Sequence, residues 1–300
     1  MLTRRAFFRA ALGATGAATG AGAYAFGIEP GVRLVTARWQ VRTEAWSGRP
    51  PLRIAALADI HIGPPWVTLA RLERIVARTN ALEADLIVLL GDYVAGHRFV
   101  SRPVPVTEVA RVLAGLRAPL GVHAILGNHD WWDDLSAQRD RRGPIIAHRA
   151  LEAVGIPVLE NAAIRLAHRR QAVWLAGLGD QLAFLPSRRP GRIGVDDLPA
   201  TLAALSDDAP AILLAHEPDI FPAVPERVAL TLSGHTHGGQ VRLLGYSPVV
   251  PSRYGNRYAY GHVTERGRHL VVSGGIGCSI LPVRVGVPPE ITLVTLEAPP

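Results

Sequence analysis

The stretch LRIAALADIH, residues 52–61, decides the fold class. A short apolar run is followed at once by Asp59 and His61, which indicates a buried strand that ends in polar side chains. The same alternation continues along the chain, with a helical pattern over 67–82, a strand over 85–92, a helical pattern over 106–117 and a strand over 121–130. Strands that alternate with helices predict parallel pairing with helices on the faces of the sheet, and therefore an α/β fold.

The second half of the chain continues this pattern with more strands. The expected elements are a helix over 133–150, two or three strands over 158–178 with a hairpin near 167–171, a basic loop over 186–194, a helix over 196–206, strands over 211–216 and 228–235, and strands and loops over 240–300. The chain contains no internal repeat and no clear linker. We therefore expect a single domain over residues 29–300 after an N-terminal segment.

The composition restricts the classes of function. The chain has 300 residues, of which 48% are hydrophobic, which is ample for a buried core. The net charge is +7, and all 32 basic residues are Arg. Because these residues form no stripe interleaved with aromatics, no nucleic-acid partner is expected. The one Cys, Cys278, excludes an intramolecular disulfide, and we expect it to be buried and inert.

The N-terminal segment is predicted to be an export signal. MLTRRAFFRAALGATGAATGAGAYAFG has no charged residue between Arg9 and Glu29, and small residues dominate it. Its start resembles a twin-arginine signal through Arg4 and Arg5, which implies the twin-arginine export machinery as a partner. Residues 1–28 would be a signal or anchor, leaving the protein extracytoplasmic, periplasmic or held at the outer face of the cytoplasmic membrane. The alternative, an ordinary amphipathic helix, is disfavoured by the glycines.

Metal-competent side chains follow five of the predicted strands. They are Asp59 with His61, Asp92, Asn128 with His129, His216, and His235 with His237. Sites in α/β sheets form beyond the carboxyl ends of the strands, so these side chains can converge. Carboxylate, amide and imidazole donors suit Mn, Fe, Zn or Co. Each piece alone also fits a turn, a helix cap or an ordinary core histidine; the complete set is what favours a metal site.

These residues resemble a known family in their order. Asp59-Ile60-His61, Gly91-Asp92, Gly127-Asn128-His129-Asp130, Ala215-His216 and Gly234-His235-Thr236-His237 are similar to the five blocks of the calcineurin-like metallophosphoesterases. The resemblance implies a four-layer α/β/β/α sandwich with two mixed β-sheets. Segments such as GNHDWW, LLAHEPDIFP and SGHTHGGQ resemble the bacterial exported or membrane-associated phosphodiesterases, a group related to UDP-2,3-diacylglucosamine hydrolases.

The resemblance also implies a binuclear metal centre. Asp59, His61 and His237 would bind the first metal. Asn128, His216 and His235 would bind the second, and Asp92 would bridge the two. A metal-bridging hydroxide would attack phosphorus, and His129 would protonate the leaving oxygen or stabilise the developing charge.

The chain departs from the protein-phosphatase branch at Ala95 and Gly96. That branch has at these two positions an Asp, which orients the catalytic His, and a substrate-binding Arg. The departure argues against a phosphoprotein phosphatase. It leaves Asp130 and Asp219 as candidates for orienting His129, and turn or cap roles explain both as well.

Other residues near the predicted site receive no binding role, so the substrate-binding residues stay open. Tyr93, Trp131 and Trp132 fit pocket walls and core packing equally well. Loop positions explain Arg98, Arg102 and Tyr254, and Gln240 fits a supporting role behind the ligands.

The leading hypothesis is a metallophosphoesterase that cleaves a phosphodiester or pyrophosphate bond. An envelope lipid or a nucleotide-sugar lipid is the candidate substrate, and a membrane surface is a candidate partner. The alternatives are a metal-binding envelope protein without turnover, and a nuclease or nucleotidase of the same superfamily. The proton donor His129 argues against the first alternative, and the lack of base-binding aromatics argues against the second.

Overall fold

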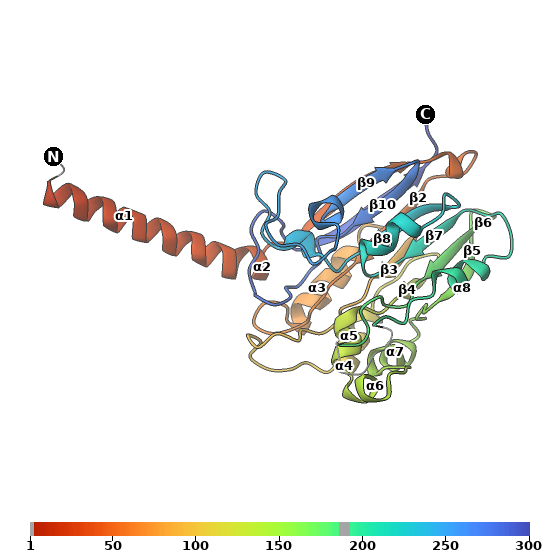
Figure 1. The fold of residues 1–300 in the computed structure, drawn as a ribbon, viewed down its shortest axis with the longest axis horizontal. Helices are drawn as coiled ribbons and strands as arrows, with labels where there is room; N and C mark the ends of the chain where they lie inside the picture. Colours follow the sequence, from red (N-terminus) through yellow and green to blue (C-terminus); the bar gives the residue numbers. More distant parts are fainter. Residues whose placement is uncertain (1–2, 186–192) are drawn as a thin grey trace.

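The structure is a computed structural model that describes residues 3–185 and 193–300. These residues form two stacked β-sheets with helices outside them (Figure 1). The first sheet has the order β1 (Val35–Arg42), β11 (Glu290–Glu297), β2 (Leu52–Leu57), β3 (Leu86–Leu89), β4 (Val122–Ala124). The second has the order β5 (Ala162–His168), β6 (Gln171–Gly177), β7 (Ala211–Leu214), β8 (Val228–Ser233), β10 (Arg268–Val272), β9 (Gly261–Glu265).

Both sheets are mixed. In the first, β2, β3 and β4 are parallel neighbours, while β11 runs antiparallel to β2 and parallel to β1. In the second, β6, β7, β8 and β10 are parallel, and β5 and β9 pair antiparallel at the two edges. The predicted α/β class with two mixed sheets is confirmed. The parallel strands bring several carboxyl ends to one side of each sheet.

The alternation of side chains along the strands divides the core into layers. In β2, Ala55 and Leu57 pack on the helices, whereas Leu52, Ile54 and Ala56 face the second sheet. In β7, Ile212 and Leu214 meet the first sheet, and Leu213 faces outward to the layer that contains α8 (Leu198–Ala203). Strands that are buried on both faces must be apolar throughout, which explains why their sequences show no polar alternation.

Helices α3 (Leu69–Asn80), α4 (Val106–Leu113) and α7 (Ile146–Glu152) cover the outer face of the first sheet. In α3, Leu72, Ile75 and Val76 form one buried stripe at helical spacing. The helix begins after Thr68, whose Oγ1 accepts the N–H of Arg71 at 3.2 Å. The helices predicted over 67–82, 106–117 and 196–206 are confirmed, each with shorter ends.

The single helix predicted over 133–150 is wrong. The segment forms α6 (Leu135–Asp140) and then α7, because the chain turns at Arg141, which has a left-handed φ of 51°. Pro144 follows in the connection and has no N–H to continue a helix. Buried Asp134 holds the two helices together, since it accepts the N–H groups of Ala137 in α6 and Ile146 in α7.

Three other segments compare with expectation as follows. The strand predicted over 121–130 ends at Ala124, and Asn128 instead begins α5 (Asn128–Trp132). The hairpin near 167–171 is confirmed by the antiparallel pairing of β5 with β6. Strand β1 was not anticipated; it lies at a sheet edge and is half exposed, so it lacks an apolar run. Most of the basic loop predicted over 186–194 lies outside the described residues.

The N-terminal segment forms helix α1 (Arg4–Ala23), which leads through a π-helical turn over Tyr24–Ile28 into α2 (Glu29–Gly31). The expectation that its glycines disfavour a helix is wrong. In Figure 1, α1 projects away from the body of the molecule. No helix within the described residues is both long and apolar enough to span a bilayer. The boundary between a signal or anchor over 1–28 and a domain over 29–300 stays a prediction.

Candidate metal centre

The predicted metal ligands lie beyond the carboxyl ends of strands from both sheets. In the first sheet, Asp59 and His61 follow β2, Asp92 follows β3, and Asn128 opens α5 after β4. In the second sheet, His216 follows β7, and His235 and His237 follow β8. The site thus forms where the ends of two stacked sheets meet, whereas the sequence pattern indicated one edge.

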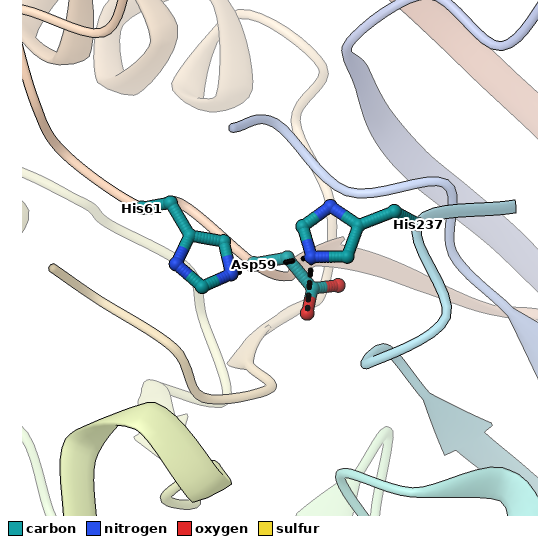
Figure 2. A group of neighbouring side chains, drawn as sticks. All are labelled: Asp59, His61 and His237. Atoms are coloured by element: carbon teal, nitrogen blue, oxygen red, sulfur yellow. Dashed lines mark hydrogen bonds and ion pairs between the residues drawn. The ribbon is translucent and has the colours of Figure 1, made fainter. Parts of the chain in front are cut away.

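Asp59, His61 and His237 form the first group of donors (Figure 2). The Nε2 atoms of His61 and His237 lie 3.2 Å apart, and the two rings are stacked with centroids 5.0 Å apart. Oδ1 of Asp59 lies 3.7 Å from Nε2 of His237. Two imidazole nitrogens and one carboxylate oxygen therefore face a common point, as ligands of one metal ion must.

Asp92 joins this group to a second one. Its Oδ2 lies 3.3 Å from Nε2 of His61 and 3.3 Å from Nε2 of His216. On the far side, Nδ1 of His235 lies 2.9 Å from Oδ1 of Asn128, and the rings of His216 and His235 are in edge contact. The structure thus brings all seven predicted ligands together, with Asp92 between the two groups.

Backbone carbonyls orient two of the imidazoles. Nδ1 of His61 lies 3.2 Å from the carbonyl of Val94, and Nδ1 of His216 lies 2.6 Å from the carbonyl of Leu90. These contacts place the proton on Nδ1 and turn the lone pair of Nε2 towards the centre. Within the described residues, the buried Nε2 of His216 has no hydrogen-bond partner. A buried imidazole nitrogen that has no hydrogen-bond partner and lies beside the Asp92 carboxylate is suited to donate its lone pair to a metal ion, so the residues fit a metal pair.

Burial and mutual interaction shift the pKa values of the acids. Burial raises the pKa of Asp59 above its ordinary value. Burial would do the same at Asp92, but the neighbouring His216 and His129 and further hydrogen bonds outweigh it and hold the pKa of Asp92 well below its usual range. The acid between the two groups is therefore kept as a carboxylate, which is the form that binds metal.

The backbone at the ligands is held in an unusual conformation. Left-handed φ angles occur at five of the seven, namely Asp59, His61, Asp92, His235 and His237. Such angles cost about 1–3 kcal/mol each for residues other than Gly and concentrate at functional sites. The neighbouring glycines are also required, since a Cβ on Gly234 would lie 2.7 Å from Oδ2 of Asp59. The strained backbone therefore lowers the stability of the fold while it orients these side chains towards the centre.

His129 lies at the edge of the centre and faces a cavity. Its backbone N–H donates to Oδ1 of Asp92 at 2.9 Å, and its Nε2 lies 3.4 Å from Oγ of Ser279. Burial lowers the pKa of His129 to about 4, so its imidazole is neutral at neutral pH. The side chain also lies within reach of His61 and Asp92 as a potential metal donor, in keeping with its place among the metal-competent residues of the sequence.

Within the described residues, neither Asp130 nor Asp219, the two residues proposed to orient His129, hydrogen-bonds to its ring. Asp130 is buried and accepts backbone N–H groups from Asp92, Tyr93 and Gly127, so it fixes the loops after β3 and β4. Asp219 accepts from Ser252 and Arg253, elsewhere in the fold. Gly96 packs closely against the side chains of both His129 and Asp133. A Cβ on Gly96 would lie 3.3 Å from Nδ1 of His129 and 3.5 Å from Oδ1 of Asp133.

The sequence reasoning missed a pair of buried acids beside the centre. Glu217 directly follows His216 and lies near His216 and His235 as a further potential donor. Burial and the neighbouring Glu217 raise the pKa of Asp180 well above its usual value. The polar dipeptide His216-Glu217 at the end of an apolar strand was the available signal for Glu217.

A cavity of about 230 Å³ opens over the centre. Trp132, Val249, Pro251 and Ile280 form its apolar wall, opposite His129 and the ligands. Tyr93 and Trp131 are instead buried in the core, so of the three aromatic candidates only Trp132 lines this cavity.

Among the polar candidates, Gln240 lines the cavity and binds the loop beyond it, accepting from the N–H of Ser279. Arg98 lines a neighbouring cavity that also reaches His129. Tyr254 packs on Tyr258 and the Arg253 and Arg257 side chains instead.

Fold and site together define a metal-dependent phosphoesterase. The family model described as calcineurin-like phosphoesterase matches residues 52–239, which contain every predicted metal ligand. The chain belongs to this family, and it is a hydrolase of the metallophosphoesterase class.

Proteins similar to this chain come from bacteria and animals. The uncharacterized metallophosphoesterase YkuE of Bacillus subtilis is 31% identical over 99% of this chain and 98% of its own length. The phosphodiesterase YaeI of Escherichia coli is 30% identical over 99% of this chain and 100% of its own. A transmembrane protein with metallophosphoesterase domain from Bos taurus is 32% identical, and the match covers 83% of this chain and 54% of that protein.

Proposed function

We propose that this protein is a binuclear metallophosphodiesterase that cleaves a phosphodiester or pyrophosphate bond in a lipid-linked substrate of the cell envelope. The observation that carries the proposal is Asp92, whose Oδ2 lies 3.3 Å from imidazoles of both donor groups. A carboxylate in that position can hold two metal ions side by side. Similarity to a protein named phosphodiesterase supports the type of bond cleaved.

The proposal assigns each residue of the site a separate role. Asp59, His61 and His237 would hold one metal ion, and Asn128, His216 and His235 would hold the other. A metal pair supplies a water of lowered pKa and a clamp on the phosphoryl oxygens. Because His129 is neutral at neutral pH, it assists the leaving oxygen by donating a hydrogen bond. The apolar wall formed by Trp132 and Ile280 suits an apolar group next to the phosphate.

The test combines metal analysis with a substrate panel on the full chain. We expect two equivalents of metal per chain after loading with Mn or Fe. Bis(p-nitrophenyl) phosphate should be cleaved faster than p-nitrophenyl phosphate, and a diacyl nucleotide pyrophosphate faster than either. Treatment with a chelator should abolish all three activities. Bound metal without turnover of any substrate would overturn the proposal and favour a metal-binding protein, and release of nucleotides from DNA or RNA would favour a nuclease.

A further inference from the structure

We infer that the loops around the catalytic cleft, together with the base of α1, form a face that docks on an anionic lipid bilayer. This docking face comprises residues 26–32, 97–102, 243–251 and 279–283. The inference rests on the proposed function only for the lipid-linked substrate. The docking itself follows from exposure, backbone geometry, contacts and charge.

The docking face carries large apolar side chains that the fold leaves in solvent. The exposed fraction is 60% for Leu243, 63% for Tyr246, 72% for Val249 and 80% for Ile280. Leu244 is fully exposed at 108%. Single exposed apolar residues are common on proteins, but a group of them around one cleft indicates a surface that is covered when the protein works.

The turn that carries Leu244 is built against local preference. Leu243 and Tyr246 exchange both backbone hydrogen bonds, so Leu244 and Gly245 form a two-residue turn. Both have positive φ, 49° for Leu244 and 81° for Gly245. Asn is the residue that such a turn favours at the first position. Neither the backbone conformation nor burial within this chain stabilises a leucine at this position. We therefore explain it by contact with an apolar environment outside the protein.

Hydrogen bonds and ring contacts join the parts of the docking face into one surface. The side chain of Gln240 donates to the carbonyl of Leu281, which ties the turn to the loop of Ile280. The N–H of Arg284 donates to the carbonyl of Ala25, which ties that loop to the base of α1. In Figure 1, α1 leaves the body at the end where these loops lie.

The third loop joins the same surface from the side of α1. Nε1 of Trp66 donates to the carbonyl of Phe26, and the Trp66 ring packs against His97. His97 in turn contacts the ring of Phe99, over which the Arg98 guanidinium lies. The exposed Phe99 therefore extends the apolar surface to the other side of the cleft.

The charge of these segments complements an anionic surface. The one acidic residue of the docking face is Glu29, which is buried. The docking face carries the exposed Arg98 and Arg102, and Arg242 directly precedes it, whereas the nearby Arg253 and Arg257 pair with Asp219 and Glu265. Basic side chains between apolar loop tips are the composition that binds to acidic headgroups and inserts shallowly beneath them. A bilayer fits this surface because the apolar side chains lie at the tips of separate loops around an open cleft, where a fluid layer can adapt to them. A lipid-linked phosphoester could then enter the cleft while its acyl chains stay in the layer.

The experiment places an environment-sensitive nitrobenzoxadiazole probe on the full chain through Leu244→Cys. The matched control is Leu135→Cys. Leu135 is a second exposed leucine, with an exposed fraction of 80%, but it lies at the start of α6 and lines neither cavity near His129. The native Cys278 is buried, so the introduced thiol is the one that reacts. With vesicles of phosphatidylglycerol and phosphatidylethanolamine, the probe at 244 should brighten severalfold and shift to the blue, and the probe at 135 should not change.

A second variant, Leu244→Asn, suits the turn and should lower partition onto the same vesicles about tenfold. Turnover of soluble bis(p-nitrophenyl) phosphate should stay unchanged in this variant. A silent probe at 244 while the chain sediments with vesicles would overturn the inference, because α1 alone would then carry the binding. Brightening without lipid as the protein concentration rises would also overturn it, in favour of a second copy of this chain. If the protein cleaves no soluble diester but the probe at residue 244 still responds to vesicles, the proposed function is refuted and the docking is supported.

Discussion

Asp92 lies between the two groups of donors. Replacing its carboxylate therefore tests whether it binds metal or only supports the packing of the site. The residue is buried, and one oxygen accepts the N–H of His129 while the other faces His61 and His216. We predict that Asp92→Asn lowers kcat by on the order of 10²–10³ and reduces bound metal below two per chain. Asp208→Asn, at an exposed position, should change neither. Full activity with full metal content in Asp92→Asn would contradict the bridging role.

His129 allows a test of how it assists the reaction. Because burial lowers its pKa to about 4, we expect it to act as a neutral hydrogen-bond donor rather than as an acid. His129→Ala should lose on the order of 10²–10⁴ in kcat with metal retained. His129→Gln keeps a neutral N–H donor and should recover part of that loss. Equal activities of the two variants would show that the hydrogen bond from residue 129 is not what matters.

The site was largely predictable at the level of single residues. A polar residue directly after an apolar strand is a strong local signal, and Asp59, His216 and His235 all carry it. What surrounds the His129 ring could not be predicted, because Gly96 and Ser279 approach it from distant parts of the chain only in the folded protein. Backbone angles such as the left-handed φ of Asp92 also leave no trace in the sequence unless Gly or Asn occupies the position.

Among the elements, the connection between α6 and α7 depends on one side chain. Asp134 is 3% exposed and accepts hydrogen bonds from Ser136, Ala137 and Ile146. We predict that Asp134→Ala lowers the free energy of unfolding by about 2 kcal/mol, because it removes a helix cap and leaves the N–H of Ile146 without its acceptor. Thermal unfolding measures the effect.

The control for that variant is Asp140→Ala on the same helix. Asp140 is exposed and forms an ion pair with the neighbouring exposed Arg139, so its loss should change stability by less than about 0.5 kcal/mol. Equal destabilisation by the two variants would mean that Asp134 does not link the helices.

Element boundaries were harder to predict than element types for a physical reason. The apolar positions of 133–150 continue across Arg141 and Pro144, so periodicity alone cannot show that the chain turns there. The outcome is decided by the left-handed φ of Arg141 and by Asp134, which are tertiary features. Strand β1 escaped prediction because only its partner β11 makes it a strand.

For the whole molecule, export through the twin-arginine route remains a proposal that the first residues motivate. Arg4 and Arg5 precede a segment without acidic residues up to Glu29. We predict that the double variant Arg4→Lys, Arg5→Lys stays in the cytoplasm in folded, metal-loaded form, and cell fractionation with an activity assay detects this. Arg33→Lys with Arg38→Lys, outside the segment, is the matched control. Unchanged export of the first variant would exclude the route.

The position of β11 has a consequence for when the protein becomes active. This strand lies near the end of the chain, yet it sits inside the first sheet between β1 and β2. Until β11 has been synthesised, β1 has no neighbouring strand, and the edge of β2 that leads into Asp59 stays unpaired. Pairing over such sequence separations is slow. The first sheet is therefore completed only after residues 290–297 have left the ribosome, and the strand edge that leads into Asp59 closes late in folding.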